Sequence, residues 1–420
     1  MKQKIKIRKV TILISAAAAL LILLDGCATS VRYYLNGGGG RVSIGLENFI
    51  ASKAKKYRGK KAALVTNHSG YDFNLEQNIR LLRDRGIDII MIMAPEHGIW
   101  GYKNDLDYKY SWYDQTVKSP VFNLFTLDRQ NLRVLFQKTD IVIFDIQDMG
   151  MRCYTYITNL KDVIDALDGL DRELIILDRP NPLGFLGVDG ANLEPRYTTR
   201  WVSAFPAPFL YDMTIGESAL YYRGEARRTV KIKVIRMKGF SRRDMFPETG
   251  QPWIPPSPNL PTYESSIVYS AVVLMEGINL SLGRGTTKPF EYIGAPWIEP
   301  VSFCSILDGL GLPNFRFKPV YFKPLFGKYT GMRCGGAQIF YTGGIFSPTE
   351  VSYRIIGAIM KRYRYAQWVQ FGYAFDIDGL AGTSRFREGI QAGKSWEAVL
   401  AELKPGIKAF EKKRKKYLLY

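Results

Sequence analysis

The chain has 420 residues, of which 46% are hydrophobic. This length and apolar content exclude a disordered chain and predict one large domain or two packed domains. The formal net charge of +19 favours anionic partners, such as nucleic acid, phosphorylated lipid headgroups or an acidic cell-wall polymer.

Residues 1–27 have the pattern of a bacterial secretion signal. A basic stretch precedes an apolar run from Val10 to Leu24, which is short for a membrane span. The following Asp25-Gly26-Cys27 resembles the end of a lipobox, in which Cys27 becomes the lipidated N-terminus. Asp25 is unusual there, so an uncleaved anchor is the alternative. We expect an exported, membrane-tethered protein on the periplasmic face, at the outer membrane if the source is Gram-negative. An exported protein seldom meets nucleic acid, so phosphorylated lipid headgroups and an acidic wall polymer stay as the anionic partners.

Residues 28–44 include four consecutive glycines and predict a flexible tether. From residue 61, short apolar runs alternate with helical segments, and this pattern predicts a parallel sheet covered on both faces. We therefore predict an α/β fold, with a Rossmann-like doubly wound domain over residues 45–262. The expected strands are 61–66, 87–94, 120–127, 139–145 and 173–178, and the expected helices are 72–86, 131–138 and 156–170.

The proline-dense stretch 251–262 can continue neither helix nor sheet, and it predicts the domain junction. Residues 263–420 are expected to form a smaller α+β domain that closes a cleft. The basic segment 411–420 is expected to be a solvated helix face. Three cysteines remain after residue 27, at a spacing unlike that of a zinc site, so we expect at most one disulfide and no cysteine-bound metal.

Polar side chains follow the predicted strands where each strand ends. Doubly wound sheets bind ligands beyond the carboxyl ends of their strands, so the chemistry is expected there. Both histidines of the chain fall in this set, which comprises Asn67, His68, Glu96, His97, Gln147, Asp148, Arg152, Tyr154, Arg179 and Asn181.

Glu96 fits a general acid, because burial beside Ile99 and Trp100 would raise the pKa of its carboxyl group. The alternative is a glutamate that binds backbone amides of its own turn. His97 could orient Glu96, contact a substrate or carry a proton, or it could be a loop histidine bound to a carbonyl. His68 leaves the same alternatives open.

Metal and nucleotide sites find little support in the spacing. The two histidines could bind a metal with Glu96, Asp145 or Asp148, but no H-x-H or H-E-x-x-H pattern is present. The first turn reads "NHSGYD" where a nucleotide-binding fold would have G-x-G-x-x-G. We expect no cofactor and no metal.

Residues 282–291, "LGRGTTKPFE", fit either an anion-holding loop or a tight turn. Glu217 fits a capping box with Thr214.

Several motifs, in a kept order, resemble the NamZ family of exo-β-N-acetylmuramidases, glycoside hydrolase family 171. They cover the chain from about residue 45 onward and are "LVTNHSG", "PEHGIWG", "DIQDMGMRCYTY", "LDRPNPLG", "MTIGE", "PPSPNLPTYESS", "EGINLSLGRGTTKPFEYIGAPW" and "FDIDGLAGT". The resemblance implies a Rossmann-like domain, a smaller C-terminal domain and an active cleft between them. It also implies release of N-acetylmuramic acid from the non-reducing end of peptidoglycan fragments without a cofactor. The family's catalytic glutamate corresponds to Glu96. Asp212, where the family usually has glycine, and residues 102–114 depart from the pattern.

Glycoside cleavage usually needs an acid and a second carboxylate. For the second group we rank Asp148 above Glu291 and Glu217. The substrate's own 2-acetamido oxygen could attack instead, with Asp148 orienting it.

Muramic acid carries a lactyl carboxylate that an arginine can bind through two hydrogen bonds. Arg152 and Arg284 are the candidates, against internal pairing with Asp148 or Glu291. The expected substrate-binding set is completed by Asn67, His68, Tyr154, Arg179, Asn181, Thr286 and Glu291. A metal-dependent deacylase or esterase and a non-catalytic wall-binding lipoprotein stay as alternative functions.

Overall fold

The computed structural model describes residues 40–102, 110–199, 202–372 and 374–420. The predicted signal peptide, Cys27 and most of the predicted tether lie outside the described residues. Within the described ranges, no helix has the length and apolar character needed to cross a membrane.

The larger part of the molecule is built on a seven-stranded sheet of order β3-β4-β2-β1-β5-β6-β7. All pairings are parallel except that of β3 with β4. Without β3 the order is that of a doubly wound Rossmann sheet, which confirms the predicted fold. The strands are β1 (Lys61–Thr66), β2 (Asp88–Ala94), β3 (Ser111–Asp114), β4 (Ser119–Asn123), β5 (Ile141–Asp145), β6 (Glu173–Leu177) and β7 (Lys231–Ile235).

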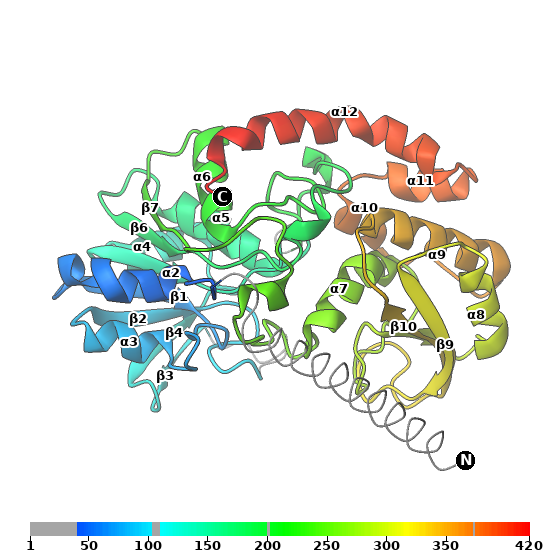
Figure 1. Ribbon diagram of the computed structural model, residues 1–420, viewed down its shortest axis with the longest axis horizontal. Coiled ribbons are helices and arrows are strands. Elements are labelled where there is room, and N and C mark those ends of the chain that lie inside the picture. The colour runs from blue at the N-terminus through cyan, green and yellow to red at the C-terminus, as the bar shows by residue number, and fades with distance from the viewer. Residues whose placement is uncertain (1–39, 103–109, 200–201, 373) are drawn as a thin grey trace, which may run out of the picture.

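Helices cover both faces of this sheet (Figure 1). On one face, α2 (Gly45–Asn48) and α3 (Asn78–Asp84) bury residues such as Leu46 and Leu82 against alternate strand side chains. On the other face lie α4 (Arg129–Phe136), α5 (Thr155–Leu167) and α6 (Ile215–Glu225). This two-sided burial explains why the strands read as nearly continuous apolar runs.

The helix predicted over 72–86 begins later, at Asn78. Leu75 adopts a positive φ of 60° and is 60% exposed, because the Asp72 side chain accepts the Glu76 N–H and closes a tight turn. Edge strands β3 and β7 were not predicted. Both are short or only half-buried, so they lack the apolar signal of the central strands.

The smaller part contains a three-stranded antiparallel sheet of order β8-β10-β9, from Tyr292–Ala295, Cys334–Tyr341 and Phe315–Phe322. A two-residue pair, β11 (Gln370–Phe371) and β12 (Ala374–Phe375), accompanies it. Its helices are α7 (Tyr263–Val272), α8 (Pro300–Asp308), α9 (Pro348–Arg362), α10 (Asp376–Ala381), α11 (Arg385–Gln391) and α12 (Trp396–Arg414). The mixture agrees with the predicted α+β character.

Helix α12, red in Figure 1, runs from the smaller part back to α6 of the larger part. Phe410 and Arg414 on this helix are buried. Within the basic segment 411–420, Lys412, Lys413, Lys415 and Lys416 are exposed, as expected of a solvated face, whereas Arg414 packs inside. The three described cysteines, Cys153, Cys304 and Cys334, are free and buried.

Candidate active site

The candidate site lies where the strand order reverses, between the carboxyl ends of β1 and β5. Asn67 follows β1, and its side-chain oxygen accepts the N–H of Ser69 at 2.9 Å. The Ser69 hydroxyl in turn accepts the N–H of Gln147, after β5, at 3.0 Å. These bonds join the two loops that form the floor of the site.

Glu96 and His97 lie in the turn after the neighbouring strand, β2. His97 has a φ of +69°, an uncommon conformation for a non-glycine residue. The Thr155 hydroxyl, in the first turn of α5, donates to the Glu96 carboxylate at 2.8 Å. The bond places the carboxyl group beside the first turn of α5.

Asp148 is buried beside this turn. One carboxylate oxygen accepts the Gly150 N–H at 2.8 Å and the Tyr211 hydroxyl, and the other has no partner within the described part of the chain. Burial raises the pKa of Asp148 to about 6, and the hydrogen bonds from Tyr211 and Gly150 oppose that rise. The group is thus mainly ionised at neutral pH and titrates in the mildly acidic range.

The two histidines lie close together. Burial, followed by the neighbouring His97, lowers the pKa of His68 to about 4, so its ring is neutral at physiological pH. Neither His68 ring nitrogen makes a hydrogen bond of ordinary geometry in the described ranges, although the backbone of Pro255 and Gly98 lies beside the ring and opposes the shift. The Nε2 of His97 lies 3.2 Å from the Ser257 hydroxyl.

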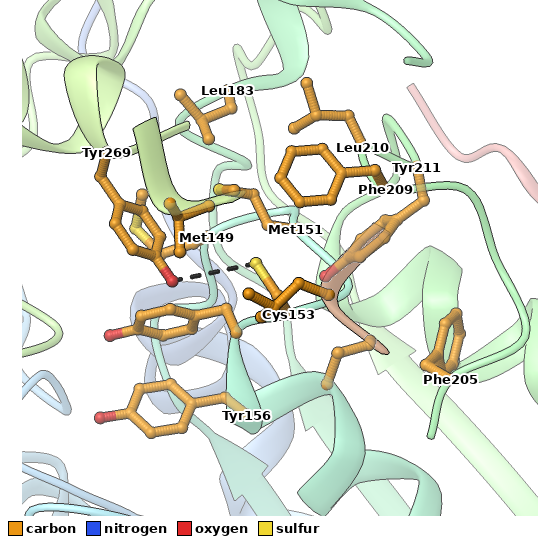
Figure 2. Packing of buried hydrophobic residues seen from close by; sticks show 14 of the residues in the cluster. Met149, Met151, Cys153, Tyr156, Leu183, Phe205, Phe209, Leu210, Tyr211 and Tyr269 are labelled. Atoms are coloured by element: carbon orange, nitrogen blue, oxygen red, sulfur yellow. Dashed lines mark hydrogen bonds between the residues drawn. The ribbon is translucent and has the colours of Figure 1, made fainter. Parts of the chain in front are cut away.

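A tyrosine cluster forms the wall behind the two carboxylates. Tyr154 packs edge-on against Tyr156 and Tyr269, with ring centroids 4.8 and 6.3 Å apart. Figure 2 shows the Cys153 thiol directed at the Tyr269 hydroxyl, at 3.9 Å. The pKa of Tyr154 is raised by burial, then by Tyr156 and Tyr269, and further by the charges of Glu96 and Asp148. Both carboxylates are therefore near the Tyr154 hydroxyl, which is buried beside the Tyr156 hydroxyl and makes no hydrogen bond of ordinary geometry in the described structure.

A cleft of about 950 Å³ opens beside this wall, between the two parts of the molecule. The larger part contributes His97 and Tyr102, and the smaller part contributes Thr286, Tyr292, Phe322 and Phe326. Its mixture of apolar rings and hydroxyl groups suits a sugar, which has both apolar faces and polar edges.

The loop 282–291 supplies the far side. Arg284 donates to Glu276 at 2.6 Å and stacks on Phe290, and Glu96 is among the charges that raise the pKa of Arg284. Lys288 pairs with Glu291 at 3.0 Å, while the other Glu291 oxygen is buried without a partner in the described residues. Of the predicted residues on this loop, Thr286 lines the cleft, whereas Arg284 and Glu291 lie outside its lining.

Arg152 requires a correction. Its side chain is fully buried, and its guanidinium donates to the carbonyls of Ala191, Ala207 and Leu380 at 2.8, 2.8 and 3.0 Å. A group enclosed by backbone carbonyls cannot reach a sugar carboxylate. Nor does it pair with Asp148 or Glu291, the alternative considered from sequence.

Arg179 and Asn181 also make internal bonds. Arg179 pairs with Asp145 at 2.6 Å and donates to the Tyr71 carbonyl. Asn181 donates to the Met213 carbonyl and accepts the Leu183 N–H. These contacts shape the loops at the sheet edge. Arg179 borders a separate, very small cavity of about 10 Å³ rather than the main cleft.

Glu217 forms the predicted capping box with Thr214 at the start of α6. It also pairs with Arg242, so its two oxygens are occupied within the fold. Among the described residues, no three His, Cys, Asp or Glu side chains gather in a way that could hold a metal ion.

Comparison with known proteins identifies the family. Residues 62–264 match the family described as exo-beta-N-acetylmuramidase NamZ, N-terminal, and residues 267–420 match its C-terminal counterpart. The chain belongs to the NamZ family of exo-β-N-acetylmuramidases. It is accordingly a glycoside hydrolase, as the resemblance of its motifs implied.

Relatives of this NamZ-family chain agree in sequence and in fold. It is 35% identical over 382 residues to the peptidoglycan beta-N-acetylmuramidase NamZ of Bacillus subtilis (strain 168). This match covers 90% of this chain and 92% of the relative. Two DUF1343 family proteins from Bacteroides fragilis have similar crystal structures, with TM-scores of 0.80 and 0.69 at 28% and 29% identity. Each comparison covers 90% of this chain and 99% of the other.

Three residues at the site of this NamZ-family chain were not predicted from sequence: Thr155, Tyr211 and Ser257. Thr155 begins a helix directly after the predicted Tyr154, and this position was a usable signal. Ser257 lies in the proline-dense stretch that predicts the junction and in the motif "PPSPNLPTYESS", and neither pattern assigns it a role. Tyr211 has no local pattern that distinguishes it, because its partner Asp148 is 63 residues away.

Proposed function

We propose that the chain is an exo-acting β-N-acetylmuramidase that releases N-acetylmuramic acid from the non-reducing end of peptidoglycan fragments. The observation that carries the proposal is the Glu96 carboxyl group, held by Thr155 next to a cleft between the two parts of a NamZ-family chain. A carboxyl group at that place can protonate the leaving oxygen of a bound glycoside.

Asp148 is proposed as the second carboxylate. Its pKa of about 6 leaves it ionised at neutral pH, and a negative charge stabilises an oxocarbenium-like transition state. It would do so directly or by orienting the substrate's 2-acetamido group.

The inner end of the site offers polar atoms that suit a bound sugar. One Asp148 oxygen is buried without a hydrogen-bond partner in the described structure, and the buried Asn67 amide nitrogen and Tyr154 hydroxyl lie beside the Tyr156 hydroxyl without a hydrogen bond of ordinary geometry. Buried polar atoms are rarely left unsatisfied, so the acetamido and hydroxyl groups of the glycone are proposed as their partners.

Arg284 is proposed to recognise the lactyl carboxylate of muramic acid. Its guanidinium is close enough to Glu96 for that charge to act on its pKa, and it pairs with Glu276 at 2.6 Å. A lactyl group would share that guanidinium, which can donate to two carboxylates through different edges.

The test is turnover of a chromogenic β-N-acetylmuraminide by the full chain. Glu96→Gln is expected to lower kcat by at least about a thousandfold, because it removes the proton donor at constant size. Glu264→Gln, on the exposed side of the first turn of α7, is the matched control and is expected to leave kcat unchanged. No turnover by the unmodified chain would overturn the proposed function, and undiminished turnover by Glu96→Gln would overturn the role of Glu96.

We further propose that the mature protein is tethered to a membrane through lipid on Cys27. Fatty-acid labelling and membrane fractionation in the bacterial host test this proposal. Cys27→Ala is expected to lose the label and to release the processed protein, whereas Cys153→Ala is expected to change neither. A labelled Cys27→Ala protein would contradict lipidation at that residue.

A further inference from the structure

The junction between the two parts touches the catalytic turn directly. Ser257 lies in the proline-dense stretch 251–262, and its hydroxyl is 3.2 Å from Nε2 of His97. Ser257 is only 7% exposed, and its hydroxyl also accepts the Asn259 N–H at 3.3 Å. The contact joins a segment between the two parts to the residue next to Glu96.

The same junction is bonded to α5. The Tyr156 hydroxyl donates to the Pro256 carbonyl at 2.6 Å, and Tyr156 is almost fully buried. Thr155, its neighbour on the helix, donates to Glu96 at 2.8 Å.

These bonds form a closed ring, which we call the acid ring. It consists of three pairs of adjacent residues, Glu96-His97, Thr155-Tyr156 and Pro256-Ser257, joined by three hydrogen bonds. The sheet edge, helix α5 and the junction each contribute one pair. In a closed ring each pair is held by hydrogen bonds to both of the other pairs. Breaking any one of the three bonds turns the ring into an open chain, in which the pairs can shift.

The backbone conformation of His97 needs contacts such as those of the acid ring to hold it. A φ of +69° is costly for a residue with a Cβ atom, and it persists only where surrounding contacts hold it. The hydroxyl of Ser257 holds the His97 ring, and the hydroxyl of Thr155 holds the Glu96 carboxylate, one on each side of the same peptide bond.

We propose that Ser257 and Tyr156 are positioning residues, which set the orientation of Glu96 and His97 by fixing the interdomain junction against α5. The proposal rests on the assigned role of Glu96. Neither residue needs to touch the substrate. The junction also connects to the smaller part, which forms one side of the cleft. The same contacts therefore position that side of the cleft and Glu96.

The kinetic test uses Ser257→Ala, Tyr156→Phe and the double variant in the full chain, with the chromogenic muraminide as substrate. Each single change is expected to lower kcat about tenfold while KM stays within about twofold, because it alters geometry rather than binding. The double variant is expected to lose little more than either single one, because one broken bond already opens the ring. Losses that multiply to about a hundredfold would overturn the acid ring.

Two controls remove the same groups elsewhere. Tyr263→Phe deletes a buried tyrosine bond to a proline carbonyl, that of Pro182, and Ser352→Ala deletes a buried serine bond to the Ala271 carbonyl. Both are expected to keep kcat within about twofold of the unmodified chain. Melting temperatures of all variants show whether a loss of activity reflects unfolding.

A second measurement is independent of activity. The chain has only two histidines, so nitrogen NMR of histidine-labelled full chain resolves His97 from His68. Tyr156→Phe is expected to move the ring signals of His97, although the Tyr156 hydroxyl bonds to Pro256, and Tyr263→Phe is expected to leave them in place. Unmoved His97 signals in Tyr156→Phe would overturn the proposal even if the chain proved inactive on muraminides, a result that would count against the proposed function alone.

Discussion

At the scale of single residues, the two carboxyl groups of the site differ because their surroundings differ. Glu96 is partly buried next to His97, which lines the cleft, and has a hydroxyl donor, whereas Asp148 is buried with two donors and one unpartnered oxygen in the described structure. Burial raises the pKa of Asp148 and hydrogen bonds hold it near 6. The balance keeps Asp148 ionised at neutral pH.

Replacing Tyr211 by phenylalanine tests this balance. The Tyr211 hydroxyl stabilises the ionised form of Asp148, so Tyr211→Phe raises the pKa of that carboxyl. The acidic limb of kcat/KM against pH, expected near 6, then moves upward by about one pH unit. Tyr221→Phe, which removes a tyrosine bond to the Pro206 carbonyl, is the control. An unmoved limb in Tyr211→Phe would assign it to another group.

Asp148→Asn is expected to lower the activity and to raise the free energy of unfolding. A carboxyl whose pKa is 3.8 when unfolded and about 6 when folded binds more protons in the folded state between those values. Stability therefore falls as pH rises from 3.8 to 6, by an amount on the order of 3 kcal/mol. Asparagine carries no charge to desolvate, so urea denaturation at pH 7.5 should show a more stable protein with little activity. A less stable variant at pH 7.5 would contradict this account.

At the scale of elements, α12 fastens the smaller part to the larger part through a buried ion pair. Arg414 donates to the carboxylate of Asp212 at 2.9 Å and to its carbonyl at 2.6 Å. Asp212 has a φ of +45°, which explains why glycine is usual there in the family. Beyond Arg414, the Tyr420 hydroxyl bonds to Asp178, at the end of β6.

Removing Arg414 is expected to cost stability. Arg414→Met leaves the buried Asp212 carboxylate with only the longer contacts to Arg243 and Arg242, at 3.4 and 3.7 Å. The free energy of unfolding should fall by about 2 kcal/mol, because the buried carboxylate loses its closest charged hydrogen-bond donor. Lys412→Met, on the exposed side of the same helix, should change it by less than about 0.5 kcal/mol in the same urea titration. Equal effects of the two changes would rule out the ion pair as the cause.

At the scale of the whole molecule, one hydrophobic cluster runs through both parts. It includes Val65 and Leu160 of the large sheet and its helices, together with Phe303 and Ile356 of the smaller part. Asp189 of the larger part also bonds to Ser347 and to Thr349, at the start of α9. The two predicted domains thus share a core.

We therefore expect the chain to unfold in one cooperative transition. A shared core couples the parts, because neither can open without exposing apolar surface of the other. Differential scanning calorimetry should give a single peak whose calorimetric and van't Hoff enthalpies agree, and a fragment of residues 45–262 should not melt cooperatively. Two resolved peaks would show independent domains.

The sequence by itself determined the architecture and indicated Glu96 as the candidate acid. Apolar runs of strand length, alternating with amphipathic helices, specify a doubly wound sheet, since burial on both faces depends on local patterning. Glu96 and Asp148 could be predicted because strand ends of such a sheet meet at one edge. The capping box of Thr214 and Glu217 was equally local.

Only the tertiary structure decided what depends on partners distant in sequence. Arg152 resembled a carboxylate ligand, yet its guanidinium meets a carbonyl 228 residues away and is buried. Ser257 resembled part of a linker, yet it holds a histidine 160 residues away. Local pattern records which residue types can be buried or charged. Packing between distant segments determines which of those side chains face the cleft and which satisfy the backbone inside the fold.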